Sequence, residues 1–144
     1  MKDVLIGSKT IKFWFDDFPR EPNDTDYAVD VEQPRDGSIE YLFNPVFVKH
    51  VNDGITITGD LKVKALIPKI DDLLTLKASH LFWNIKWEKH LFDACFLSQR
   101  GAKINKELFF DLVKFWESYH GKRYNSDLTL DPEKFFDNAI NGEN

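Results

Sequence analysis

Asp24 and Asp26 are separated by one residue, and their spacing is the one in this sequence that most clearly suggests a catalytic or metal-binding site. They stand at the start of a segment with strand character, Thr25 to Glu32. Alternate residues of a strand point to the same face, so both carboxylates can aim at one site. Neighbouring carboxylates favour Mg²⁺, which prefers oxygen ligands and keeps several of its waters. The pair therefore predicts a magnesium site; the alternative is that Asp24 only caps a turn.

A small turn, Gly7-Ser8, comes before this pair and follows a short apolar strand, Val4 to Ile6. Gly7 lets a phosphate approach the backbone closely. Ser8 offers a hydroxyl and a good N-cap for a helix from about Lys9 to Phe15, and the free N–H groups at the start of a helix suit an anion. A Gly-Ser turn after a strand is common in other proteins too, so it supports a site only together with the aspartates.

The bulk composition is that of a globular protein. Its 144 residues suit one domain, with 42% hydrophobic and 30% charged residues. The net charge of −5 argues against a protein that coats nucleic acid through long-range attraction, and leaves a local basic groove open. The single cysteine, Cys95, cannot form an internal disulfide or a metal–thiolate cluster, and its apolar neighbours predict a buried structural thiol.

We expect no targeting signal in this sequence. The apolar stretch at the N-terminus is too short for a signal peptide. No window approaches the roughly 20 apolar residues that a membrane span needs. We therefore expect a cytoplasmic protein with no membrane partner.

The order of elements predicts an α+β fold, in which a small N-terminal mixed sheet precedes a helical C-terminal half in a single domain over residues 1–144. Residues 34–37, Pro-Arg-Asp-Gly, are of types that strongly favour a turn. This turn predicts a β-hairpin between strands over residues 25–32 and 38–43. Residues 45–51 could form a short helix or a loop. In residues 55–58 the alternation of apolar and polar residues is too short to assign a secondary structure.

The second half reads as helical. The expected helices cover residues 61–67, 76–97 and 106–119, with a last short one opening at Asp131. Gly101 ends the long helix. On that helix His80 and His90 are too far apart to share a metal ion. We interpret His80 as a structural histidine, with nucleotide contact as the alternative.

The chain resembles the polymerase-β-like nucleotidyltransferases in the order of its expected elements: a strand, a Gly-Ser turn, a helix, a loop and an Asp-x-Asp strand. In that superfamily a Gly-Gly or Gly-Ser turn precedes a helix, and an Asp-x-Asp strand lies beside it. The resemblance implies a nucleotidyltransferase-like topology, with Asp24 and Asp26 on Mg²⁺ and with Gly7 and Ser8 on the phosphates of an NTP. Nucleotidyl transfer needs phosphates neutralised and an in-line attack arranged, mostly by metal and positioning.

The toxin-like branch of that superfamily, of the abortive-infection and type IV toxin kind, is the most similar. Its members carry an Arg just before the Asp-x-Asp, a later Lys on a helix, and a Lys-Asp-x-x-Asp-like element. The matching residues are Arg20, Lys77 (within TLKASH) and Lys89 with Asp93 (within WEKHLFD). The resemblance implies that Lys77 neutralises phosphate charge and that Arg20, Lys89 and Asp93 lie near the nucleotide. The alternatives are a solvated Lys77 and an exposed Lys89–Asp93 ion pair.

The sequence departs from the family pattern at three points. His90 stands where the last element has an acidic residue, and the loop between Ser8 and Asp24 is long and rich in Asp and Pro. The third carboxylate of the family is not obvious. Our candidate is Glu40, which is either a third metal ligand that helps to activate the attacking hydroxyl or an exposed strand residue. The resemblance covers residues 4–43 and 75–97.

Two functions follow from the resemblance. One is a small Mg²⁺-dependent nucleotidyltransferase that uses ATP or another NTP, with tRNA, a protein side chain or a small molecule as acceptor. The other is a binding module on the same fold with weak or no catalysis, of a kind common in phage genomes, which sequesters a nucleotide or binds a host protein. A purely structural protein is a third reading, and it requires the acids to lie on different surfaces.

Overall fold

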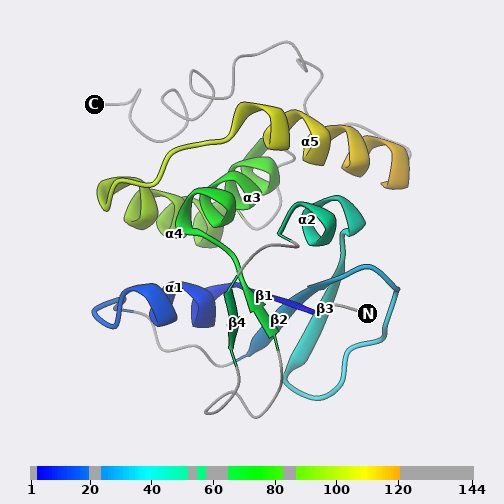
Figure 1. Cartoon of the computed structure of the whole chain (residues 1–144), viewed down its shortest axis with the longest axis horizontal. Coiled ribbons are helices and arrows are strands. Elements are labelled where there is room, and N and C mark those ends of the chain that lie inside the picture. The colour runs from blue at the N-terminus through cyan, green and yellow to red at the C-terminus, as the bar shows by residue number, and fades with distance from the viewer. Residues whose placement is uncertain (1–2, 20–23, 52–54, 58–64, 83–86, 121–144) are drawn as a thin grey trace. The chain divides into compact units, whose positions relative to one another are not determined.

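Contacts within the chain divide it into two units, Met1–Lys69 (unit 1) and Ile70–Asn144 (unit 2). The computed structural model describes residues 3–19, 24–51, 55–57, 65–82 and 87–120. In these residues unit 1 carries a sheet with two short helices, and unit 2 carries three longer helices (Figure 1). The α+β class with a helical C-terminal half is therefore confirmed. The single-domain organisation stays a prediction.

The described part of unit 1 is built on a five-stranded mixed sheet with the strand order β3-β2-β1-β5-β4. The strands are β1 (Val4–Ile6), β2 (Thr25–Val29), β3 (Ile39–Phe43), β4 (Ile55–Ile57) and β5 (Ala65–Ile67). The central strand β1 is antiparallel to β2 and parallel to β5. The predicted mixed sheet is thereby confirmed.

The β2–β3 pair is parallel, so the predicted hairpin is wrong. Asp26 lies opposite Glu40 in this parallel register. The turn closes on itself at the first residue of β3: the Asp36 N–H donates to the Ile39 carbonyl at 3.0 Å, and the Ile39 N–H donates to the Asp36 carbonyl at 2.9 Å. Gly37, with a φ of 60°, permits this tight local reversal. The chain then enters β3 in the direction of β2.

The strand β5 replaces part of a predicted helix. Residues 61–67 were expected to be helical, but residues 65–67 pair with both β1 and β4. The Leu66 N–H donates to the Asp3 carbonyl at 3.0 Å, which fixes β5 beside the start of β1. Long-range strand pairing therefore overrides the local helical pattern.

The helix α1 (Ser8–Trp14) begins one residue earlier than predicted. Gly7, not Ser8, has the N-cap position, and Ser8 is the first helical residue. At the other end the Trp14 indole N–H donates to the Pro68 carbonyl at 2.9 Å. This bond ties α1 to the end of β5.

The helix α2 (Pro45–His50) resolves the ambiguity of residues 45–51. Its N-cap is Asn44, whose side-chain oxygen accepts from the Phe47 N–H at 3.0 Å. Pro45 at the first helical position is favourable because its fixed φ suits a helix and no N–H is lost.

One face of the sheet in unit 1 is apolar. The buried cluster there is Leu5, Tyr27, Val29 and Ile67, and Trp14, Ile39 and Tyr41 pack against it. Successive side chains of a strand point to opposite faces. Asp26 and Glu40, which alternate with the residues of this cluster along β2 and β3, therefore lie on the other face.

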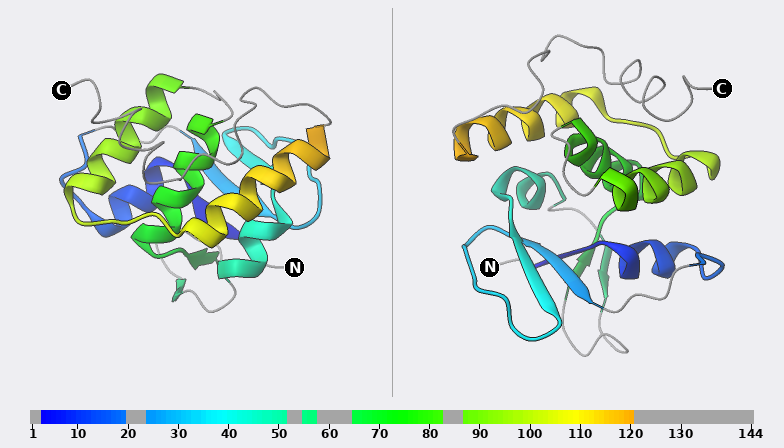
Figure 2. Two further views of the ribbon diagram at one scale, coloured as in Figure 1. Left: turned by 90° about the horizontal axis from the view of Figure 1, so that it is seen from above. Right: turned by 180° about the vertical axis from the view of Figure 1, so that it is seen from behind.

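Unit 2 contains α3 (Ile70–Phe82), α4 (Trp87–Gln99) and α5 (Lys106–His120). The helix α3 packs against both α4 and α5, and the left view in Figure 2 shows α5 passing obliquely over α3. The single long helix predicted over residues 76–97 is wrong, because α3 and α4 are separate helices that pack on each other. The predicted helix at residues 106–119 is confirmed. The helix expected to open at Asp131 lies outside the described residues.

The helix α4 ends at a glycine, as predicted. Gly101 has a φ of 93°. The Ala102 N–H donates to the Leu97 carbonyl at 3.2 Å, and the Gly101 N–H donates to the Ser98 carbonyl at 3.1 Å. These two bonds are the Schellman pattern, which satisfies the last carbonyls of a helix.

The connection from α4 to α5 is held on the first turns of α3. The Lys103 N–H donates to the Asp71 carboxylate at 2.9 Å, and the Asn105 N–H donates to the Thr75 hydroxyl at 2.9 Å. The Asn105 side chain then caps α5 by accepting from the Leu108 N–H at 3.0 Å.

None of the described helices is long and apolar enough to cross a membrane.

Candidate functional site

The Asp26 carboxylate lies directly against the Gly7 backbone. Ile6 at the end of β1 is opposite Asp26 on β2, so the chain leaves β1 beside this carboxylate. A Cβ placed on Gly7 would be 2.4 Å from Asp26 Oδ2, and the φ of Gly7 is 80°. Glycine is therefore required here for two reasons, its conformation and its lack of a side chain. The Gly-Ser turn and the Asp-x-Asp strand meet at this point.

Glu40 joins the two aspartates at the same end of the β2–β3 pair. It is the register partner of Asp26, so both side chains project to the same face. The guanidinium of Arg35 links Glu40 to Asp24: Nη1 pairs with Glu40 Oε1, and Nη2 is 3.6 Å from Asp24 Oδ1. Arg35 Nε also donates to the Gly37 carbonyl at 2.9 Å. All three carboxylates predicted from the sequence thus come to one region of unit 1.

The three carboxylates have the oxygen chemistry of Mg²⁺ ligands, but their arrangement is not that of a metal centre. No three His, Cys, Asp or Glu side chains in the described part of the chain form a group that could hold a metal ion. Arg35 pairs with Asp24 and Glu40, while Asp26 lies over Gly7. The guanidinium therefore provides the positive charge for two of the three acids.

The Arg35 ion pairs are partly exposed. The side chain of Arg35 is 55% exposed, that of Asp24 44% and that of Glu40 34%. Water screens pairs of this kind, and each contributes about 0–1 kcal/mol. Another cation can therefore exchange with Arg35 at small cost.

Two cations near these acids were not foreseen as site residues. One is Arg35, which had been assigned only to a turn. The other is Lys9 on α1, whose ammonium donates to the hydroxyl of Thr25, the residue between the two aspartates. The sequence signal for Lys9 is its position directly after the Gly-Ser turn. Arg20, the cation that the resemblance selected, lies outside the described residues.

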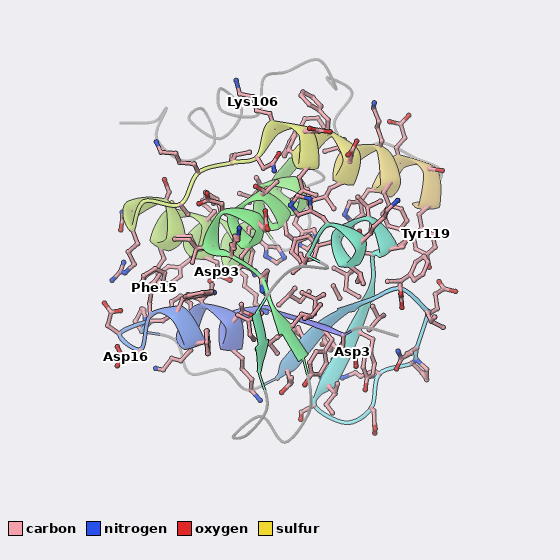
Figure 3. All side chains as sticks on the ribbon, viewed as in Figure 1. Asp3, Phe15, Asp16, Asp93, Lys106 and Tyr119 are labelled. Atoms are coloured by element: carbon pink, nitrogen blue, oxygen red, sulfur yellow. The ribbon has the colours of Figure 1, made fainter. Side chains whose placement is uncertain are left out.

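In unit 2, Lys77 and Asp93 form a buried ion pair. Lys77 Nζ is 3.0 Å from Asp93 Oδ2, and the side chains are 3% and 0% exposed. Asp93, labelled in Figure 3, comes from α4, and Lys77 comes from α3. Asp93 therefore finds its cation on the neighbouring helix and not in Lys89, one turn back on its own helix. The solvated Lys77 considered above is excluded by this burial.

Two histidines complete this cluster. His90 Nδ1 is 3.3 Å from Lys77 Nζ, and the ring centroids of His80 and His90 are 4.7 Å apart. The Trp116 ring on α5 meets His80 edge-on, with centroids 5.7 Å apart. The expectation that the two histidines lie far apart on a single helix is wrong, because His80 is on α3 and His90 is on α4, and these helices pack on each other. The sequence signal is the three-residue spacing of Lys77–His80 and His90–Asp93, which puts each pair on one helix face.

The position of α3 explains why these groups are buried. Every residue from Leu73 to His80 is buried, as expected of a helix packed on two sides. A buried charge is tolerated when it is paired, and here Lys77 and Asp93 cancel each other. Lysine has only donors, so His90 Nδ1 accepts and a neutral His90 carries its proton on Nε2.

Two further ionisable groups have pKa values changed by burial. Burial raises the pKa of the Asp3 carboxyl, and the nearby Asp30 raises it further. Burial also raises the pKa of the half-buried Cys95 thiol. A thiol with a raised pKa is a poor nucleophile, which agrees with the structural role predicted for Cys95.

The comparison with protein families places a match in unit 2. Residues 72–143 match the family model described as a domain of unknown function (DUF7275), which is half of the chain. No curated protein and no solved structure matches the chain. The match includes the buried cluster of Lys77, His80, His90 and Asp93, and it begins after the carboxylates of unit 1.

Proposed function

This chain belongs to the DUF7275 family, whose defining domain has no known function, and we propose that it is a nucleotidyltransferase. The proposed reaction moves a nucleotidyl group from an NTP to an RNA, protein or small-molecule acceptor, with tRNA as one RNA candidate. The observation that carries this proposal is the contact between Asp26 and the Gly7 backbone. It joins the two motifs on which the resemblance to the polymerase-β-like enzymes rests.

The order of elements in unit 1 supports the proposal. The strand β1, the turn at Gly7, the helix α1 and the antiparallel strand β2 follow one another, and β3 brings Glu40 beside Asp26. This is the order of strand, small turn, helix and Asp-x-Asp strand that the resemblance implies. A nucleotidyltransferase topology is part of the proposal.

The described carboxylates do not form a metal-binding group as they stand, so the proposal requires Asp24, Asp26 and Glu40 to converge when Mg²⁺ binds; the ion would then neutralise phosphate charge. This requires Arg35 to exchange its ion pairs with Asp24 and Glu40, which their exposure permits. The Ser8 hydroxyl donates to a phosphate oxygen. The roles that the resemblance gives to Lys77, Lys89 and Asp93 in unit 2 stay predictions.

Replacing Asp26 with asparagine tests the proposal. Asp26→Asn removes one negative charge with almost no change in size, so the fold should be kept. We expect transfer of labelled nucleotide to total RNA or protein, in the presence of Mg²⁺, to fall to background. The thermal midpoint should stay within about 2 °C of the wild type, as for substitutions away from the core.

The matched control is Asp16→Asn, an exposed aspartate on the turn after α1 (Figure 3). It changes the net charge by the same amount and should leave transfer unchanged. Full activity in Asp26→Asn would remove the assignment of the site.

A second candidate function is a binding module with weak or no catalysis. The pairing of Arg35 with Asp24 and Glu40 favours it, because two of the three acids are then neutralised without a metal ion. Such a module sequesters a nucleotide or binds a host protein, as some phage proteins do. The same labelled NTPs decide between the two: saturable binding with no product supports the module.

A further inference from the structure

We propose that Arg35 is a switch residue of the proposed site. Its guanidinium neutralises Asp24 and Glu40 while these acids hold no metal ion, and it passes to the phosphates of the nucleotide when they bind Mg²⁺. This role rests on the proposed function. The resemblance did not select Arg35, so the switch gives the site a phosphate-binding residue outside the family pattern.

Arg35 contacts three groups through three different nitrogens. Nη1 pairs with Glu40 Oε1, Nη2 is 3.6 Å from Asp24 Oδ1, and Nε donates to the Gly37 carbonyl at 2.9 Å. Glu40 lies on β3, and Asp24 directly precedes β2. In the part of the chain that the structure describes, these two acids therefore share one cation. Both have to release it before they can converge on a metal ion.

The backbone beside Arg35 is held in place, so the switch needs a movement of the side chain alone. Asp36 and Ile39 exchange two backbone hydrogen bonds, of 3.0 and 2.9 Å, at the start of β3. The side chains of Arg35 and of its two acidic partners are all partly exposed. Water solvates each group when a pair opens, so such pairs open at small cost. The released guanidinium then stays near the start of β3.

A released guanidinium needs new oxygen partners. Arginine keeps its charge at every physiological pH, and its planar fork forms bidentate hydrogen bonds with phosphate as well as with carboxylate. A phosphate that binds the same metal ion as Asp24 and Glu40 lies beside the guanidinium that this ion has displaced. Arg35 can therefore exchange the oxygens of two carboxylates for those of a phosphate.

The two states of Arg35 make opposite predictions for the two ligands. Without nucleotide, the guanidinium competes with the metal ion for Asp24 and Glu40. With nucleotide, it binds the phosphates. Removing it should therefore strengthen the binding of metal alone and weaken the binding of nucleotide in the presence of metal. An arginine that only shapes the turn would give weaker binding of both when it is lost, and one that only blocks the acids would give stronger binding of both.

The test uses Arg35→Gln in the full chain, which removes the charge and keeps a hydrogen-bond donor. Mn²⁺ takes the same oxygen ligands as Mg²⁺, and the EPR signal of free Mn²⁺ measures its binding. We expect the Mn²⁺ affinity to rise by up to about fivefold for each exposed ion pair removed. With Mn²⁺ at saturation, the affinity for an ATP analogue with a non-hydrolysable α,β bond should fall about tenfold, because a charged hydrogen bond is lost.

Two further variants isolate the guanidinium. Lys49→Gln removes one positive charge at an exposed position at the end of α2, and it should change neither affinity. Arg35→Lys keeps the charge without the planar fork. Its Mn²⁺ affinity should stay near that of the wild type, and its nucleotide affinity should lie between those of the wild type and Arg35→Gln.

Unchanged or weaker Mn²⁺ binding in Arg35→Gln overturns the switch, and so does an unchanged or higher affinity for the nucleotide analogue. The same changes in Lys49→Gln also overturn it, because they would show an effect of net charge alone. If transfer depends on Asp26 but the two affinities do not move in opposite directions, the proposed function stands and the switch falls. A wild type that binds no Mn²⁺ removes both the switch and the metal site.

Discussion

Gly7 is a position at which a single atom matters, because a Cβ there would meet the Asp26 carboxylate at 2.4 Å. Gly37 and Gly101 also have positive φ values, 60° and 93°, but nothing lies within 4 Å of a Cβ placed on them. Gly37→Ala and Gly101→Ala should therefore lose only the conformational term, about 1–2 kcal/mol. Gly7→Ala should lose about 1–3 kcal/mol more, as overpacked sites do. Urea unfolding measures all three, and equal losses would show that the Asp26 contact is not tight.

The residues of the site were predictable from the sequence only in part. The spacing of Asp24 and Asp26 is local, and it was enough to select them. The role of Arg35 depends on the parallel register of β2 and β3, which brings Glu40 next to Asp26. Nothing in the turn sequence around Arg35 specifies that register. The pairing of Arg35 with two of the acids therefore could not be predicted.

Elements with local start and stop signals were predicted well. The end of α4 at Gly101 and the start of α5 at Lys106 follow from capping chemistry within a few residues of those ends. The errors are at the β2–β3 pair, at β5 and at the boundary between α3 and α4. All three depend on contacts between segments distant in sequence: strand pairing in the first two cases and helix packing in the third.

The cap of α5 can be tested at this scale. Asn105→Ala removes the oxygen that accepts from the Leu108 N–H, and we expect a loss of about 1 kcal/mol in the free energy of unfolding. Asn105→Asp keeps the acceptor and adds a negative charge at the helix N-terminus, which is favourable. Its stability should stay near that of the wild type. If urea unfolding gives both variants the same loss, the cap does not stabilise α5.

The whole chain combines a family domain with a unit outside the family match. Unit 2 begins at Ile70, and the match begins two residues later at residue 72. The carboxylates on which the proposed chemistry depends belong to unit 1, while the buried ion pair belongs to unit 2. If residues 1–144 form a single domain, as predicted, the two units unfold together, and damage in one should appear in the other.

Lys77 allows this to be tested, because it supplies the ammonium that pairs with the buried Asp93 carboxylate. Lys77→Met should lower the free energy of unfolding by about 3–5 kcal/mol, since removing one partner leaves a buried charge. The double variant Lys77→Met/Asp93→Asn should recover a large part of that loss, because both substitutes are uncharged and close in size to the residues they replace, so no buried charge is left unpaired.

Hydrogen exchange in Lys77→Met then reports on both units. In one cooperative domain the slowest amides of β1 and β2 lose protection by the same factor as those of α3, because all of them exchange through global unfolding. A loss confined to α3, α4 and α5 would contradict the single-domain prediction. In that case unit 2 is the independently folding element that the family match describes, and the carboxylates of unit 1 are carried by a second domain.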